Sequence, residues 1–273
     1  MRLRPYLPKY WKMESKPALT VVKIGGNVID NEQALQNFLE DFAALEGYKI
    51  LIHGGGKIAT KTAESLGITA VFHEGRRITD KPMLDVAVMT YAGLINKNIT
   101  AKLQSLKNNA MGFTGADGNL ILSAKRKDAV VDFGFVGDVL AVNADLMTIL
   151  IKQNVVPVFS AITHDGYGQL LNTNADTIAS TLAVACSSNF NVKLLYCFEK
   201  KGVLMDAGNE ESVIKNLTFE IYQNLRELKV IHSGMLPKLE NCFNALQQGV
   251  SQISIGSPDI LKKGNSIFTQ VTA

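Results

Sequence analysis

The stretch "VVKIGGNVID" (residues 21–30) places one lysine, Lys23, in an otherwise apolar run that ends at two glycines. Its apolar, β-branched residues predict a strand, and the following Gly-Asn pair predicts the turn that ends it. Two explanations for the lysine stay open. Lys23 either faces solvent from an edge strand, or it points at a phosphate whose oxygens approach the backbone of Gly25 and Gly26.

A second glycine loop follows the next predicted strand. "YKILIH" (48–53) runs directly into "GGGK", and a helical segment at 57–67 comes after it. Loops that follow parallel strands share one edge of a sheet, where ligands bind, and glycines there let backbone N–H groups approach an anion. Two such loops on consecutive strands, one of them with a lysine, predict a polyphosphate held between them.

Neither loop matches a standard nucleotide-binding motif. A Walker A loop needs serine or threonine after its lysine, but Lys57 is followed by Ile58. The dinucleotide fingerprint needs a glycine where Ala59 or Thr60 stands. Its absence argues against a nicotinamide-dependent dehydrogenase, which the fold class alone would allow. We interpret His53, beside the glycines, as a packing and hydrogen-bonding residue rather than a catalyst.

Strand-like and helix-like segments alternate along almost the whole chain. This alternation is typical of an α/β fold whose mostly parallel central sheet is covered by helices on both faces. Strands are predicted at 19–24, 48–53, 155–162, 192–198 and 251–255, with short strands and turns between 111 and 142. Helices are predicted at 31–47, 57–67, 80–106, 174–187, 218–229 and 237–248. A soft boundary near 165–172 suggests two lobes that share the sheet.

The composition is that of an ordinary globular chain. Of the 273 residues, 47% are hydrophobic and 19% are charged, which excludes a disordered protein. The net charge is +3, but residues 1–16 contribute +4 through five basic residues against Glu14, so the rest of the chain sits near −1. Because no broad basic surface is indicated, nucleic acid is not expected as a partner.

The cysteines and the apolar runs bear on the cellular compartment. Cys186, Cys197 and Cys242 are odd in number, far apart and surrounded by apolar residues, which is typical of buried free thiols in a reducing cytosol. No apolar run approaches the ~18–20 residues of a membrane span, and the N-terminus lacks the apolar core of a secretory signal. We therefore expect a cytoplasmic protein without a membrane partner.

Three further segments place polar groups at helix starts or beside a glycine. They are "GRRIT" (75–79), "NTNADTIAS" (172–180) and "SGMLPKLENC" (233–242). Asn172 or Asn174 is the expected helix cap, and Arg76 fits a solvated side chain. Lys238 is different, because a cation in the first turn of a helix opposes the helix dipole. That position favours an anionic ligand for Lys238.

Six motifs together resemble those of a known family. They are "VKIGGN", "IHGGGK", "GRRIT", "FGFVGDV", "NTNADTIA" and "SGMLPK". In this order they resemble the amino acid kinase superfamily, and most closely the N-acetylglutamate kinase family. The resemblance implies a three-layer α/β/α sandwich in which residues 19–170 bind an acyl-glutamate and residues 171–273 bind MgATP. Residues 1–18 then form an extension, whose "LRPYLPKYW" resembles a helix that joins dimers into hexamers.

The resemblance also implies roles for individual residues. Lys23 and Lys238 correspond to the lysines that meet the transferring phosphoryl group, and Asp176 to the aspartate that orients them. The phosphate-cradling positions are Gly25, Gly26, Gly55 and Gly56. Arg77 and Asn172, together with the second glycine loop at Gly55, correspond to the groups that bind the substrate and its α-carboxylate. No metal ligand is implied in the protein, since ATP carries the Mg²⁺.

The implied reaction is ATP-dependent phosphorylation of the γ-carboxylate of an N-acylated glutamate, a step of arginine biosynthesis. This carboxylate has a free pKa near ~4.3 and is already ionised at neutral pH, so no general base is needed. The difficulty is electrostatic, and two lysines, backbone N–H groups and Mg²⁺ are the groups that phosphoryl transfer requires. Arginine suits the flat α-carboxylate.

Several positions depart from the family pattern. Lys57 stands where a proline usually follows the glycines, and Glu199 stands where an aspartate is usual. The ending "KKGNSIFTQVTA" also differs from the family's usual ending, so arginine feedback stays open, as does the choice between dimer and hexamer. The acyl group, acetyl or succinyl, stays open too. A succinyl group would want an extra cation, but the charge run at 125–127 is more typical of a solvated face.

Other functions stay open beside this one. Other superfamily members are one alternative, although uridylate and carbamate kinases lack the "GRRIT" and "NTNAD" pair and aspartokinases carry long regulatory extensions. A non-catalytic arginine or nucleotide sensor with the same fold is an alternative from another class, but both lysines are present. We also expect a homodimer or a higher homo-oligomer, with the long apolar helix at 80–106 as a candidate dimer seam.

Overall fold

The computed structural model describes residues 15–206, 208–228, 230, 235–262, 264 and 266–272. The predicted N-terminal oligomerisation helix falls on residues that lie outside these ranges. Within the described residues, no helix is long and apolar enough to cross a membrane.

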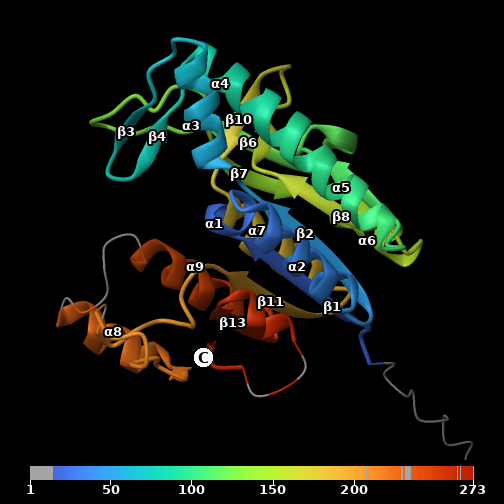
Figure 1. The fold of residues 1–273 in the computed structure, drawn as a ribbon, viewed down its shortest axis with the longest axis vertical. Helices are drawn as coiled ribbons and strands as arrows, with labels where there is room; N and C mark the ends of the chain where they lie inside the picture. Colours follow the sequence, from blue (N-terminus) through green and yellow to red (C-terminus); the bar gives the residue numbers. More distant parts are fainter. Residues whose placement is uncertain are drawn as a thin grey trace, which may run out of the picture.

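One large, mostly parallel sheet runs through the molecule (Figure 1). Its eight strands lie in the order β12-β14-β13-β11-β1-β2-β8-β5. All neighbours in it are parallel except β13 and β14. The bounds are β1 Ala18–Ile24, β2 Tyr48–His53, β5 Ala110–Phe113, β8 Val156–Ser160, β11 Asn191–Cys197, β12 Asn216–Leu217, β13 Gln252–Gly256 and β14 Thr269–Val271.

The direction of strand addition reverses at β1. From β1 the chain passes to β2 on one side of it, and much later to β11 on its other side. In open parallel sheets, ligands bind beyond the C-terminal strand ends at such a reversal. The topology therefore places a site beyond the ends of β1, β2 and β11, which is where the glycine loops follow β1 and β2.

Helices cover both faces of this sheet. Crossovers between parallel strands are right-handed. A connection that moves along the sheet toward β5 therefore lies on one face, and a connection that moves toward β12 lies on the other face. Accordingly α2 packs with α5, whereas α7 packs with α6 and α9 (Figure 1). Their bounds are α2 Glu32–Ala43, α5 Asn96–Ser105, α6 Ala144–Lys152, α7 Ala175–Cys186 and α9 Leu236–Gln247. The predicted α/β/α sandwich is confirmed.

Smaller elements border the large sheet. Strands β6, β7, β9 and β10 form a second sheet that closes on itself, and β3 and β4 form a hairpin. These strands are β3 Val71–His73, β4 Arg76–Ile78, β6 Ile121–Lys125, β7 Val136–Val142, β9 Ile162–His164 and β10 Leu170–Thr173. The remaining helices are α1 Gly26–Ile29, α3 Gly56–Ser65, α4 Lys81–Ala87, the π-helical η1 Val88–Ile95, the short η2 Asp117–Asn119 and η3 Pro258–Leu261, and α8 Phe219–Glu227.

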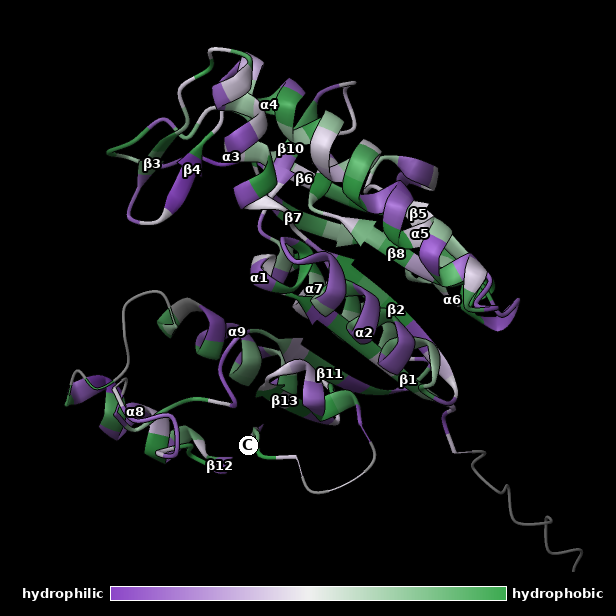
Figure 2. Cartoon of the chain, in the orientation of Figure 1, coloured by the Kyte–Doolittle hydropathy of each residue, from purple (hydrophilic) through white to green (hydrophobic). Residues whose placement is uncertain are grey.

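The core lies between the large sheet and its helices. Figure 2 shows the strands of the sheet mostly in the hydrophobic colour, while the helices alternate along their length. Strands β2 and β8 are buried at nearly every residue, which is why they read as continuous apolar runs. Cys186, Cys197 and Cys242 are buried and free, as predicted.

The structure corrects three sequence-based expectations. Because β1 pairs with both β2 and β11, it is an interior strand, and the edge-strand explanation for Lys23 is wrong. The helix predicted at 80–106 is present, with Asp80 capping it, but its middle is the π-helical η1. Helix α6 and the short strands β12 and β14 were not predicted.

Candidate active site

Three predicted site residues meet beyond the end of β1. Lys23 is the penultimate residue of β1, Asp176 is the second residue of α7, and Lys238 lies in the first turn of α9. The Nζ of Lys23 is 2.7 Å from Oδ1 of Asp176, and the Nζ of Lys238 is 3.4 Å from Oδ2. One carboxylate therefore holds two lysines, one from strand β1 and one from helix α9.

The local sequence fixes the position of Asp176. The side chain of Asn174 caps α7 by accepting hydrogen bonds from the backbone N–H groups of Asp176 and Thr177, at 2.7 and 3.1 Å. The hydroxyl of Tyr196, on β11, donates to the carbonyl of Asp176 at 3.1 Å. Of the two asparagines predicted as candidate caps, Asn174 is the cap, which leaves Asn172 for another role.

The electrostatics of this cluster favour an anion. Burial acts to raise the pKa of Asp176, but the charges of Lys23 and Lys238 outweigh it and lower that pKa from 3.8 to about 2. Asp176 is therefore a carboxylate at neutral pH, and the three residues together carry one net positive charge. The Lys238 ammonium also lies over the rings of Tyr196 and Phe198, 5.6 and 5.3 Å from their centroids. These cation–π contacts stabilise the positive charge of Lys238.

The first glycine loop is tied to the neighbouring strand. The N–H of Gly25 donates to the carbonyl of Cys197 at 2.9 Å, so in this state it is not free to bind a phosphate. A Cβ on Gly25 would lie 3.4 Å from that same carbonyl oxygen. Gly26 begins α1, so its N–H lies among the unpaired donors of a helix start.

The second glycine loop requires its glycine. Gly55 has φ +150°, and a Cβ there would lie 2.2 Å from Cδ1 of Ile95. Gly55 caps α3 without a side chain, and Gly56 is the first residue of that helix. The loop thus packs directly on η1, and only a residue without a side chain fits this contact.

Arg77 and Asn172, the predicted substrate-binding pair, lie on β4 and β10. Arg77 donates to the carbonyl of Gly56 at 2.9 Å and to Oγ1 of Thr60 at 2.8 Å. The Nδ2 of Asn172 donates to Oγ1 of Thr79, just past the end of β4, at 3.0 Å. The structure therefore places Arg77 against the backbone of the second glycine loop. It places Asn172 beside the residue that follows β4, the strand of Arg77.

A polar link joins the two glycine loops to the end of β11, and sequence reasoning missed its central residue. Lys57 donates to Oδ1 of Asn27, whose Nδ2 donates to Glu199. The Nζ of Lys57 is also 3.6 Å from Oδ2 of Asp30. Lys57 and Glu199 are two of the departures from the family pattern noted above. The only signal for Asn27 was its place directly after the first glycine pair.

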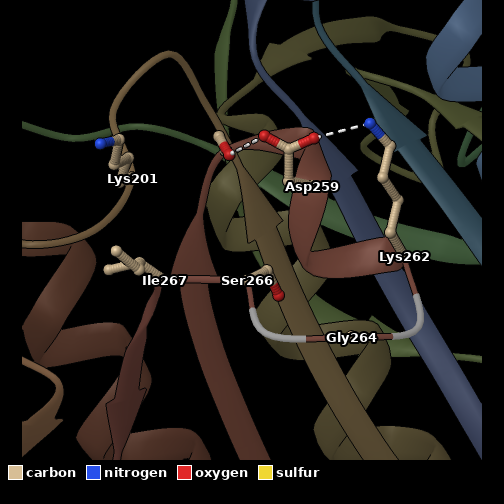
Figure 3. Close-up of a pocket in the computed structure, with 7 residues that line it drawn as sticks. Lys201, Asp259, Lys262, Gly264, Ser266 and Ile267 are labelled. Atoms are coloured by element: carbon tan, nitrogen blue, oxygen red, sulfur yellow. Dashed lines mark hydrogen bonds and ion pairs between the residues drawn. The ribbon is translucent and has the colours of Figure 1, made fainter.

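Several charged side chains elsewhere are paired with neighbours. In the run at 125–127, Arg126 makes a bidentate pair with Asp138, and Lys125 lies 3.7 Å from Asp132. A cavity of about 360 Å³ is lined by residues from Lys201 and from 257–267, and Lys23, Asp176 and Lys238 are not among its lining residues (Figure 3). Within it, Asp259 accepts from Ser257 and Lys262.

The described residues were also compared with the side-chain groups that hold metal ions. Among the described residues, no group of three or more His, Cys, Asp or Glu side chains could hold a metal ion. The one carboxylate between the two lysines is engaged by both of them. Two ammonium groups on one carboxylate suit the oxygens of a phosphate.

Comparison with known proteins assigns the family. The family model described as "Amino acid kinase family" matches residues 18–257. The chain belongs to the amino acid kinase family. An acetylglutamate kinase of Cytophaga hutchinsonii is 53% identical over 261 residues, covering 93% of this chain and 98% of that protein. One from Parabacteroides distasonis is 51% identical over 246 residues, covering 90% of this chain and 96% of its own.

Solved structures of the same fold agree with this membership. The protein smu.665 from Streptococcus mutans superposes with a TM-score of 0.75 at 25% identity, covering 93% of this chain and 98% of that one. Carbamate kinase from Giardia lamblia bound to AMP-PNP gives a TM-score of 0.65 at 13% identity, covering 94% and 98%. At that identity the second likeness concerns the fold of this amino acid kinase and not its substrate.

Proposed function

We propose that this amino acid kinase transfers the γ-phosphoryl group of ATP to the γ-carboxylate of N-acetyl-L-glutamate, a step of arginine biosynthesis. The curated relatives at 51–53% identity carry the name acetylglutamate kinase and match along nearly their whole length. The observation that carries the proposal is the Lys23–Asp176–Lys238 cluster beyond the end of β1. It offers net positive charge at the place where the topology puts a ligand.

The chemistry needs charge neutralisation and alignment rather than a base. An oxygen of the ionised γ-carboxylate attacks the γ-phosphorus, the bond from that phosphorus to the β–γ bridging oxygen breaks, and ADP leaves with the electron pair. Lys23 and Lys238 are ammonium donors for the phosphoryl oxygens as charge develops there. Asp176 touches both lysines and acts as the positioning residue between them. Mg²⁺, when bound on the nucleotide, neutralises further phosphate charge.

The acyl-glutamate and the nucleotide are proposed to bind to different parts of the chain. Residues 19–170 form the proposed acyl-glutamate lobe and residues 171–273 the nucleotide lobe. Arg77 is proposed to bind the substrate α-carboxylate with Asn172, because a guanidinium pairs with a planar carboxylate in two-pronged geometry. The N–H groups of Gly26, Gly55 and Gly56 complete the proposed phosphate cradle.

Two finer features belong to the same proposal. The acetyl form is favoured over the succinyl form, because the relatives at 51–53% identity carry the name acetylglutamate kinase. A homodimer is favoured by Met89 and Leu94 on η1, which are 52% and 54% exposed. A cytoplasmic location agrees with the buried free thiols.

The test is formation of an acyl phosphate from ATP and Mg²⁺, trapped by hydroxylamine, with N-acetylglutamate, N-succinylglutamate and free glutamate in parallel. We expect activity on N-acetylglutamate. Lys238→Ala should lower turnover on the order of 10²–10³-fold, as expected for loss of one preorganised donor. Lys81→Gln, which removes an exposed cation paired with Asp85, is the matched control and should keep wild-type turnover. Activity on free glutamate alone would move the chain to another kinase family, and inactivity on all three would favour a sensor.

A further inference from the structure

His53 and Asn96 form a buried polar pair beneath the second glycine loop. His53 is the last residue of β2 and is 0% exposed, and Asn96 is the first residue of α5 and is 1% exposed. The Nδ2 of Asn96 lies 3.0 Å from Nε2 of His53 and 2.9 Å from the carbonyl oxygen of Val158. The Nδ1 of His53 lies 2.9 Å from the carbonyl oxygen of Gly54.

These contacts determine the tautomer of His53. The carbonyl of Val158 can only accept, so the nitrogen of Asn96 that faces it is the amide NH₂ group. The other N–H of that group then points at Nε2 of His53, which must accept and carries no proton. The proton of the neutral imidazole is therefore on Nδ1, where it donates to the carbonyl of Gly54.

The fixed Gly54 carbonyl orients the next N–H. No cis peptide bond occurs in the described chain, and in a trans peptide the C=O and the following N–H point in opposite directions. Holding the Gly54 carbonyl on the buried imidazole therefore turns the N–H of Gly55 away from it. Within the described residues, the Gly55 N–H donates to no protein acceptor, so it remains available to a ligand.

The π-helical segment η1 supports the same loop. Tyr91 and Ile95 stand under Gly55, whose added Cβ would lie 3.1 Å from Cδ1 of Tyr91 and 2.2 Å from Cδ1 of Ile95. Asn96 follows directly and reaches His53. The π-helical segment and the residue after it thus place Tyr91, Ile95 and Asn96 under one loop, in line with the frequent occurrence of π segments at functional sites.

Asn96 is not the choice that stability alone would favour. Its Oδ1 is buried and has no hydrogen-bond partner among the described residues. A buried unpaired acceptor destabilises the fold, because it gives up its hydrogen bonds to water and gains none in return. Asn96 also requires a glycine on the neighbouring strand β5, because a Cβ on Gly112 would lie 1.9 Å from Oδ1 of Asn96. The pair is maintained despite these costs, which indicates a role beyond packing.

We propose that His53 and Asn96 are positioning residues that aim the free N–H of Gly55 at the reacting groups between the two glycine loops. Neither side chain touches substrate. Asn96 fixes the imidazole, the imidazole fixes the Gly54 carbonyl, and the carbonyl fixes the direction of the N–H donor. The proposal rests on the phosphotransferase function proposed above, but the hydrogen-bond arrangement itself can be tested without turnover.

Two substitutions of His53 distinguish the role of its Nδ1 from the role of its Nε2. The amide nitrogen of asparagine can take the place of Nδ1, so His53→Asn keeps a donor for Gly54. Glutamine extends to the place of Nε2, so His53→Gln keeps an acceptor for Asn96 but loses the donor. Both variants lose the imidazole packing. We expect kcat of His53→Gln to be on the order of 10- to 100-fold below that of His53→Asn at similar melting temperatures, because small displacements of catalytic groups cost this much. His73→Gln, an exposed control, should match the wild type.

Nitrogen-15 NMR of the full-length wild-type protein tests the arrangement directly, since the two ring nitrogens have distinct shifts in each tautomer. We expect His53 to be neutral with its proton on Nδ1, whether or not the enzyme turns over. A proton on Nε2, or equal kcat values in His53→Gln and His53→Asn, would overturn the proposal. Wild-type inactivity with all acceptors, combined with the expected tautomer, would instead count against the proposed function.

Discussion

The charge of Asp176 should contribute measurably to stability as well as to the site. Its pKa in the folded chain is about 2 against 3.8 for the free group, because the two lysines outweigh the opposing effect of burial. Its side chain is 19% exposed, so solvent screens this interaction only in part. A depressed carboxyl pKa stabilises the fold above about pH 4, and this contribution is lost as pH falls toward 2. The shift corresponds to about 2 kcal/mol at pH 7.

We therefore expect Asp176→Asn to lower the free energy of unfolding by about 2 kcal/mol at pH 7. Urea unfolding followed by circular dichroism measures it. In a Lys23→Met background the same change should cost less, because one of the two balancing charges is already gone. Asp85→Asn, in an exposed i,i+4 pair with Lys81, is the control and should have little effect. The reasoning is refuted if Asp176→Asn is as stable as the wild type, or if its cost is equal in both backgrounds.

Three further changes test separate parts of the account. Arg77→Ala should raise KM for N-acetylglutamate at least tenfold in steady-state kinetics while kcat changes little, because it removes binding common to ground and transition states; a fall in kcat alone would contradict this. Gly55→Ala should destabilise the chain by roughly 3 kcal/mol in urea unfolding, because its Cβ would stand 2.2 Å from Cδ1 of Ile95 at φ +150°; wild-type stability would contradict the loop geometry. Burial lowers the pKa of His53 from 6.5 to about 4, so stability should be full above about pH 6.5 and fall by about 3 kcal/mol toward pH 4. His53→Gln should flatten this pH dependence in urea unfolding, and His73→Gln should not.

The sequence predicted the fold and the lysine cluster for a common physical reason. Buried parallel strands read as apolar runs, and the loops after them share one sheet edge. Lys23 stood in such a run, and Lys238 stood in a first helical turn, where its charge opposes the dipole. Each residue was thus unusual in its local context. Their common partner Asp176 followed from the resemblance, and the structure places it between them.

The rest of the site depends on contacts that no local pattern encodes. His53 and Asn96 are 43 positions apart, and their contact needs the π turn of η1. An apolar segment such as "VMTYAGLI" looks the same in a π-helix and an α-helix, so periodicity did not reveal it. Asn27 and Glu199 are 172 positions apart and meet only because β11 pairs with β1.

Secondary structure was missed where its signal was short or was overlooked. Strands β12 and β14 have two and three residues, too few for an alternating pattern. Helix α6 did carry a signal, because the side chain of Asn143 caps it by accepting from the N–H of Leu146 at 3.1 Å. A cap followed by apolar residues at helical spacing was present there in the sequence.

The central claim is that a γ-carboxylate oxygen of N-acetylglutamate attacks the γ-phosphorus of ATP. The most direct test uses N-acetylglutamate with ¹⁸O in its γ-carboxylate, ATP, Mg²⁺ and excess hydroxylamine, and examines the released phosphate by ³¹P NMR. Hydroxylamine attacks the acyl carbon, so the phosphate should leave with one ¹⁸O atom from the substrate. Phosphate without ¹⁸O would mean that water, and not the carboxylate, had taken the phosphoryl group, which would contradict the account.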